Sequence, residues 1–114
     1  MLTKDALLAY GASYDEGMAR CLNKEDFYFK MIRMVAANEK FASLGSALIA
    51  KDLQAAFEDA HALKGIVANV SLTPLSDALE AIVEPLRRRE DIDYTVMYAR
   101  IVALKKQLDE IVAQ

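Results

Sequence analysis

Residues 53–70 read LQAAFEDAHALKGIVANV, a stretch whose apolar residues recur at the spacing of a single amphipathic helix. The apolar residues share one stripe of that helix: Leu53, Phe57, Ala60, Leu63, Val67 and Val70. A second stripe consists of Gln54, Glu58, His61, Gly65 and Ala68. At about 100° per residue, the centre of the apolar stripe lies roughly 120° from His61. We therefore predict that His61 points to solvent from a helix anchored on its other side.

His61 is the only histidine in the 114 residues, so any imidazole chemistry of this chain must take place there. One helical turn later stands Gly65, a poor helix former that costs up to about 1 kcal/mol relative to alanine. Together with Ala68, a further turn along, Gly65 leaves little side-chain bulk beside the imidazole. This spacing indicates a shallow approach to the ring.

Composition limits the class of protein. The length of the chain predicts one domain over residues 1–114. No apolar run reaches the roughly 18 to 20 residues of a membrane span and the start lacks a secretory pattern, so we expect a cytoplasmic protein without membrane contact. The single cysteine, Cys21, agrees with a reducing compartment. The net charge of −3 disfavours nucleic acid as a partner, and we interpret the one basic run, Arg87–Arg89, as serving a helix end and solubility.

Two short helices are predicted at the start of the chain. Thr3 is placed to cap a helix from about Lys4 to Tyr10. A second short helix is expected from Tyr14 to Leu22, where Ser13 and Glu16 have the spacing of a capping box. Helices of this length need tertiary support, so we expect both to lie across one end of the main body. The residues expected to anchor them are Leu7, Leu8, Tyr14, Met18 and Leu22.

The next segment predicts one long helix. Apolar residues keep a single helical phase over residues 24–50, across Asn38 and Glu39, without an intervening proline. This phase predicts a helix of about 27 residues, roughly 40 Å long. Asp52 is expected to cap the following helix, which carries His61 and runs to about Val70.

Two further helices complete the predicted fold. One follows Thr73 and Pro74, residues suited to a helix start, and we expect it to kink or fray at Pro85. The last runs over about 94–113. No segment has the pattern of a strand, and short connections make neighbouring helices antiparallel. We therefore predict an all-α fold, an up-and-down antiparallel four-helix bundle with two short N-terminal helices packed across one end.

The pentapeptide His61-Ala62-Leu63-Lys64-Gly65, on the second long helix of such a bundle, resembles the motif of the histidine-containing phosphotransfer (HPt) family. The resemblance extends to the short lead-in helices, to the start of the long helix and to the link before residue 53. It implies a phosphorelay intermediate that takes a phosphoryl group from the aspartyl phosphate of one receiver domain onto His61 and passes it to an aspartate of another. The implied partners are receiver domains of response regulators or hybrid histidine kinases.

The resemblance also implies a histidine phosphotransfer carrier, which we expect to be a monomer. Because the sequence lacks nucleotide-binding motifs, we expect no kinase activity of its own. No cofactor is expected on this chain, because the receiver supplies the carboxylates and the Mg²⁺. His61 is expected to be the nucleophile and transient phosphoryl carrier, and Lys64, one turn away, to attract phosphate oxygens. The surface expected to dock the partner consists of Gln54, Glu58, Gly65, Ile66, Ala68 and Asn69.

Two positions depart from the family pattern. Ser71 stands where glycine is usual at the end of the histidine helix, and serine adopts a left-handed backbone less easily. Val83 stands at the usual offset of a glutamine that holds the non-reacting ring nitrogen. Glu80, one turn earlier, with Glu84 behind it, is then the candidate for orienting the ring.

Other classes of site fit less well. The spacing Glu58-x-x-His61 imitates half of a di-iron site, but one histidine cannot complete it, so no metal site is expected. The sequence contains no P-loop and no glycine-rich nucleotide motif.

The alternative function is a phosphorylation-independent helical adaptor that docks a receiver domain or another signalling protein. Its interaction face would include Tyr28, Phe29 and Met31.

Overall fold

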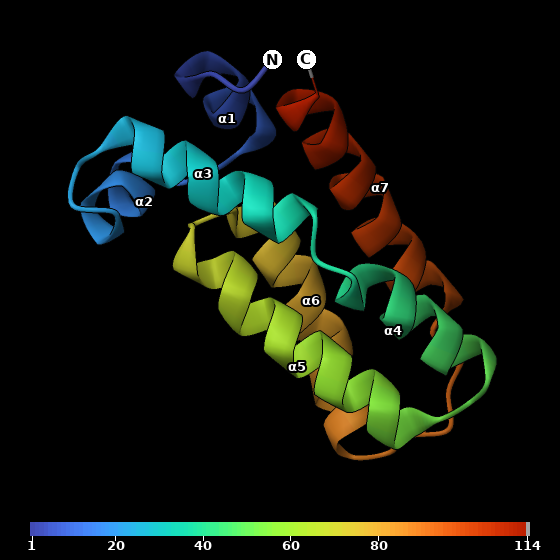
Figure 1. The fold of residues 1–114 in the computed structure, drawn as a ribbon. Helices are drawn as coiled ribbons and strands as arrows, with labels where there is room; N and C mark the ends of the chain where they lie inside the picture. Colours follow the sequence, from blue (N-terminus) through green and yellow to red (C-terminus); the bar gives the residue numbers. More distant parts are fainter. Residues whose placement is uncertain (114) are drawn as a thin grey trace.

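The structure, a computed structural model, describes residues 1–113, and these residues form helices and connections without a strand (Figure 1). The helices are α1 (Lys4–Tyr10), α2 (Tyr14–Arg20), α3 (Glu25–Ala36), α4 (Lys40–Ile49), α5 (Leu53–Asn69), α6 (Thr73–Arg87) and α7 (Thr95–Val112). The prediction of an all-α fold is confirmed. Within the described residues, no helix combines the length and the apolar character needed to cross a membrane.

The two short helices form where the sequence predicts them. The Thr3 side chain accepts a hydrogen bond from the Ala6 backbone N–H at 3.1 Å, which is the predicted cap of α1. The predicted capping box of α2 is wrong, because the Ser13 hydroxyl bonds no helix N–H. Ser13 Oγ instead lies 2.8 Å from Thr73 Oγ1, which ties the start of α2 to the start of α6.

The predicted anchors of these helices are buried only in part. Leu7 and Tyr14 are buried, whereas Leu8 and Leu22 are exposed. The α1 helix also contacts α7, where the Tyr10 hydroxyl donates to the Leu104 carbonyl at 3.0 Å. Figure 1 shows the start of the chain and the end of α7 at this side of the molecule.

The prediction of one helix over residues 24–50 is wrong. α3 ends at Ala36, and α4 begins at Lys40 after a short bend that Figure 1 shows between the two helices. At the bend, Asn38 Oδ1 accepts a hydrogen bond from the Lys40 backbone N–H at 2.8 Å. A side chain that bonds the local backbone in this way competes with the helical hydrogen bonds, and asparagine does so readily.

The remaining helices begin and end close to the predicted positions. Asp52 caps α5, because its carboxylate accepts from the Ala55 N–H at 3.1 Å. The α6 helix continues through Pro85 to Arg87, so the predicted disruption at Pro85 does not end the helix. The α7 helix begins at Thr95, whose N–H donates to Asp93 Oδ1 at 2.9 Å.

The core brings the inner faces of the long helices together. α5 contacts α4 and α6, and α7 contacts α6 and α3. The fully buried side chains of these helices include Leu44, Leu63, Leu79, Ile82, Ile101 and Leu108. Burial of these apolar residues holds one face of α5 against the core. The other side of α5 carries His61 and Gly65, and both residues are exposed.

Candidate functional site

His61 lies near the middle of α5 and is exposed, as its place on the polar stripe predicts. Its imidazole ring stacks on the ring of Phe57, one turn earlier, with the ring centroids 5.3 Å apart and the planes 9° from parallel. Residues four apart on a helix are neighbours on its surface, which brings the two rings together. The imidazole is therefore open to solvent but rests on an aromatic ring.

Phe57 also contacts two arginines from the end of α6. The guanidinium carbons of Arg87 and Arg89 lie 5.1 Å and 5.2 Å from the centroid of the Phe57 ring, within the range of a cation–π interaction. Arg89 also donates to Gln54 Oε1 and, at 2.7 Å, to the Leu86 carbonyl. The latter bond agrees with the role at a helix end that the sequence indicates. The sequence did not predict that the basic run approaches Phe57, because the contact depends on how the end of α6 returns to the start of α5.

Lys64, Glu80 and Glu84, the charged residues expected to act on the His61 ring or its phosphoryl group, form ion pairs. Lys64 Nζ lies 3.5 Å from a carboxylate oxygen of Glu80 on α6, and Glu84 lies 3.2 Å from Arg87 Nε. Of the described residues, none forms a hydrogen bond with the His61 ring. Both candidates for orienting the ring, Glu80 and Glu84, therefore have other partners in this structure.

Open space lies beside the histidine. A Cβ atom built on Gly65 would meet nothing within 4 Å. Among the other residues expected to dock a partner, Gln54, Glu58 and Asn69 are exposed, and Ile66 and Ala68 are half-buried. These residues all belong to α5, so a partner that contacts them would meet one helix surface with His61 near its centre.

The two departures from the family pattern are accommodated differently. Ser71 adopts the left-handed backbone expected of the usual glycine, with φ at 56°. Its carbonyl accepts from the Ser13 N–H at 2.9 Å, and its hydroxyl donates to Glu16 at 3.3 Å, bonds that support this conformation. Val83 is fully buried in the core and brings no polar atom to the histidine.

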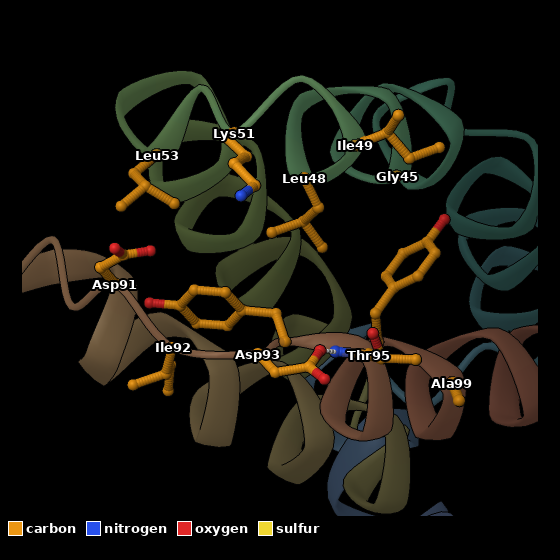
Figure 2. A pocket seen from close by; sticks show the side chains of 12 residues that line it. Gly45, Leu48, Ile49, Lys51, Leu53, Asp91, Ile92, Asp93, Thr95 and Ala99 are labelled. Carbon is orange, nitrogen blue, oxygen red and sulfur yellow. Dashed lines mark hydrogen bonds between the residues drawn. The ribbon is translucent and has the colours of Figure 1, made fainter.

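A groove of about 980 Å³ lies elsewhere, between the α4–α5 connection and the segment that leads into α7 (Figure 2). Its walls include Leu48, Leu53, Ile92 and Tyr98, but neither His61 nor Lys64. No group of three or more potential metal ligands occurs in the described part of the chain. The only imidazole of the chain therefore lies on an open helix surface and outside this groove.

Comparison with known proteins agrees with this geometry. The family model described as "Hpt domain" matches residues 34–114, which include α4 to α7 and the histidine motif. Searches of curated proteins and of solved structures found no significant match. The match covers well over half of the chain, and Hpt domains carry out phosphotransfer in two-component signalling through contacts with receiver domains. An exposed histidine on α5 and the family match over residues 34–114 together show that this chain belongs to the Hpt-domain family.

Proposed function

We propose that this chain is a phosphorelay intermediate that accepts a phosphoryl group on His61 from the aspartyl phosphate of one receiver domain and passes it to an aspartate of another. The observation that carries the proposal is the exposed imidazole with open space at Gly65, one turn away on the same helix. A receiver domain is bulky, so its phosphorylated aspartate reaches only a nucleophile that stands clear of neighbouring side chains.

The transfer needs little covalent chemistry from the protein. A nitrogen of the neutral His61 ring attacks phosphorus, and the bond from phosphorus to the aspartyl oxygen breaks, so that the carboxylate leaves with the electron pair. The ring then loses the proton on its other nitrogen to water. Attack on phosphorus by the aspartate of the second receiver, with uptake of a proton, restores the free imidazole. The receivers supply the carboxylates and Mg²⁺, so the proposal assigns no cofactor to this chain.

Lys64 is the proposed electrostatic assistant. Its ammonium lies 3.5 Å from Glu80, and both side chains of this pair are partly exposed. Exposed ion pairs contribute only about 0–1 kcal/mol, so Lys64 can exchange Glu80 for phosphoryl oxygens at small cost. The same exchange would release Glu80, which remains the proposed candidate for orienting the ring, with Glu84 behind it.

The proposed docking surface consists of Gln54, Glu58, Gly65, Ile66, Ala68 and Asn69 around His61. We infer that the chain acts as a monomer in the cytoplasm. We also infer that the helices form an up-and-down four-helix bundle, in which α3 and α4 together take the place of one long helix. Residues 1–33 lie outside the family match, but α1 packs on α7, so we infer one domain over the whole chain.

The test is phosphotransfer from a receiver domain. The protein is incubated with a panel of phosphorylated receivers and then assayed for phosphate that is labile in acid and stable in alkali. Wild type is expected to gain this label, and His61→Gln is expected to lose it while keeping the same helical circular dichroism. Label on His61→Gln, or a wild type that no receiver labels, would overturn the proposal.

The adaptor alternative makes a different prediction in the same experiment, namely binding of a receiver without transfer of label. The structure weakens its proposed face. Tyr28 is fully buried and its hydroxyl donates to the Val70 carbonyl at 2.8 Å, while Phe29 and Met31 pack partly buried against the core. These residues therefore serve the interior, and no observation favours an adaptor over a phosphocarrier.

A further inference from the structure

We propose that Phe57 is the positioning residue of the phosphoacceptor, and that it sets the orientation of the His61 ring by stacking. The inference rests on the proposed function, because it assigns the orienting role at that site. Its evidence is the parallel contact of the two rings, 5.3 Å between centroids and 9° between planes.

The need for such a residue comes from the freedom of an exposed imidazole. The side chain of a surface histidine rotates about two bonds, and only some of its rotamers aim the reacting nitrogen away from the helix. The usual glutamine position is occupied by the buried Val83, and none of the described residues hydrogen-bonds to the ring. Glu80 and Glu84 pair with Lys64 and Arg87 instead. The Phe57 ring is therefore the contact that restrains the imidazole.

Phe57 is itself held in place from α6. The guanidinium groups of Arg87 and Arg89 lie against its ring, and Arg89 is fixed in turn by hydrogen bonds to Gln54 and to the Leu86 carbonyl. Arg89 lies in the turn that ends α6, with φ at 54°, so its own backbone is part of a defined loop. A continuous set of contacts thus leads from the end of α6 through Phe57 to His61.

The size of the effect follows from the strength of ring stacking. Aromatic pairs in favourable geometry shift a conformational equilibrium by about threefold to tenfold beyond the effect of apolar burial. Loss of the Phe57 ring is expected to lower the population of the productive His61 rotamer, and the initial transfer rate, by this factor.

The experiment compares Phe57→Leu, which removes the ring but keeps apolar bulk, with Phe57→Tyr, which keeps the ring. Phe27→Leu is the matched control, because Phe27 is an aromatic residue that is 41% exposed on α3. The first measurement is the NMR shift of the His61 ring protons, which the Phe57 ring current displaces when the two rings are stacked. The second is the initial rate of phosphotransfer from a phosphorylated receiver.

Phe57→Leu is expected to shift the His61 ring protons toward random-coil values and to slow transfer about threefold to tenfold. Phe57→Tyr and Phe27→Leu are expected to keep the wild-type shifts and to stay within about twofold of the wild-type rate. Unchanged ring-proton shifts in Phe57→Leu would overturn the inference, whatever the transfer rate. Displaced shifts with an unchanged transfer rate would also overturn it, because the orientation would then not matter.

The two proposals fail in different ways. If wild type accepts no phosphoryl group from any receiver, the proposed function is wrong, and a positioning role for transfer fails with it. If wild type is labelled on His61 but Phe57→Leu transfers at the wild-type rate, only the role of Phe57 is wrong. A circular dichroism spectrum of each variant establishes that the helices are intact.

Discussion

Two of the glycines that lie inside helices, Gly45 and Gly65, have opposite surroundings. Gly45 in α4 is buried, and a Cβ atom there would contact the Tyr98 hydroxyl and come within 2.9 Å of Tyr98 Cζ. Gly65 in α5 is exposed, and a Cβ atom there would meet nothing within 4 Å. Packing inside the chain explains the first glycine. The second glycine costs helix stability, and no contact of the described residues requires it. The proposed docking surface would account for it.

The two regions also differ in chemistry. Gly45 and Tyr98 line the groove in Figure 2, whose walls are largely apolar and contain no histidine. The surface of α5 around Gly65 carries His61 and Lys64, and the ring of Phe57 beside His61 contacts Arg87. This groove is therefore separate from the proposed phosphoacceptor, and a search for function that started from the groove would miss the histidine.

The largest effect on the free energy of unfolding is expected at alkaline pH. It concerns buried tyrosines, including Tyr98, which packs against Gly45. Burial raises the pKa of Tyr98, and it raises the pKa of Tyr28 from 10.0 to about 12. Both hydroxyls donate to backbone carbonyls, so the folded protein favours their neutral form. The contribution of these hydroxyls to the free energy of unfolding is therefore fully present below about pH 10 and is lost as pH rises toward 12. For Tyr28 this loss amounts to up to about 2–3 kcal/mol. Urea unfolding between pH 8 and pH 11.5 measures this loss.

Tyr28→Phe is the control for that prediction. Without the hydroxyl, stability should fall less steeply over the same pH range, even though the starting stability is lower. An equally steep fall in the variant would show that Tyr28 does not contribute to the alkaline transition.

The second prediction concerns Gly45. Gly45→Ala should lower the free energy of unfolding by about 1–2 kcal/mol, because the new methyl group displaces Tyr98 and strains its hydrogen bond to the Phe41 carbonyl. Chemical denaturation measures the loss. The double variant Gly45→Ala/Tyr98→Phe should be less destabilised than the two single effects added together, and strict additivity would contradict the proposed clash.

Gly65→Ala should have the opposite sign. Because nothing lies near the new methyl group, the helix propensity of alanine should raise the free energy of unfolding by about 0.5–1 kcal/mol. The same denaturation experiment detects the gain. Destabilisation at this position would mean that the glycine has an internal packing role, and the contrast with Gly45 would disappear.

The smallest effect on stability is expected at Lys64. Lys64→Gln removes an exposed ion pair with Glu80 and should change the free energy of unfolding by no more than about 0.5 kcal/mol. Phosphotransfer should nevertheless slow, by about tenfold, if the ammonium assists at the phosphoryl group. Rates with Lys64→Gln and with Lys64→Arg, which keeps the charge, distinguish an electrostatic role from a structural one.

Local signals in the sequence predicted much of the fold. Thr3 and Asp52 cap the helices that follow them, because capping depends on a side chain and a backbone N–H only three residues apart. The helical period of the 53–70 stretch likewise predicted that His61 is exposed. The helical phase of the apolar residues wrongly predicted one helix across Asn38. The three-residue interruption between α3 and α4 leaves the apolar residues on either side nearly in the same phase. The local hydrogen bond of the Asn38 side chain was the signal that periodicity could not show.

The site was predicted less completely than the fold. The spacing of Phe57 and His61 by four residues was visible, but the apolar stripe placed Phe57 with the core, whereas it is half-buried at the edge. The approach of Arg87 and Arg89 to Phe57 depends on tertiary structure, because the end of α6 must return beside the start of α5. No local pattern encodes that return.

The most direct test of the docking surface is the initial phosphotransfer rate of Gly65→Leu, measured beside Ala103→Leu as a control on an exposed position of α7. Leucine is a good helix former, so Gly65→Leu should be at least as stable as wild type. We predict that transfer from a phosphorylated receiver falls more than about tenfold in Gly65→Leu, because the new side chain fills the space beside His61, and that Ala103→Leu transfers normally. Transfer at the wild-type rate in a folded Gly65→Leu would contradict the account.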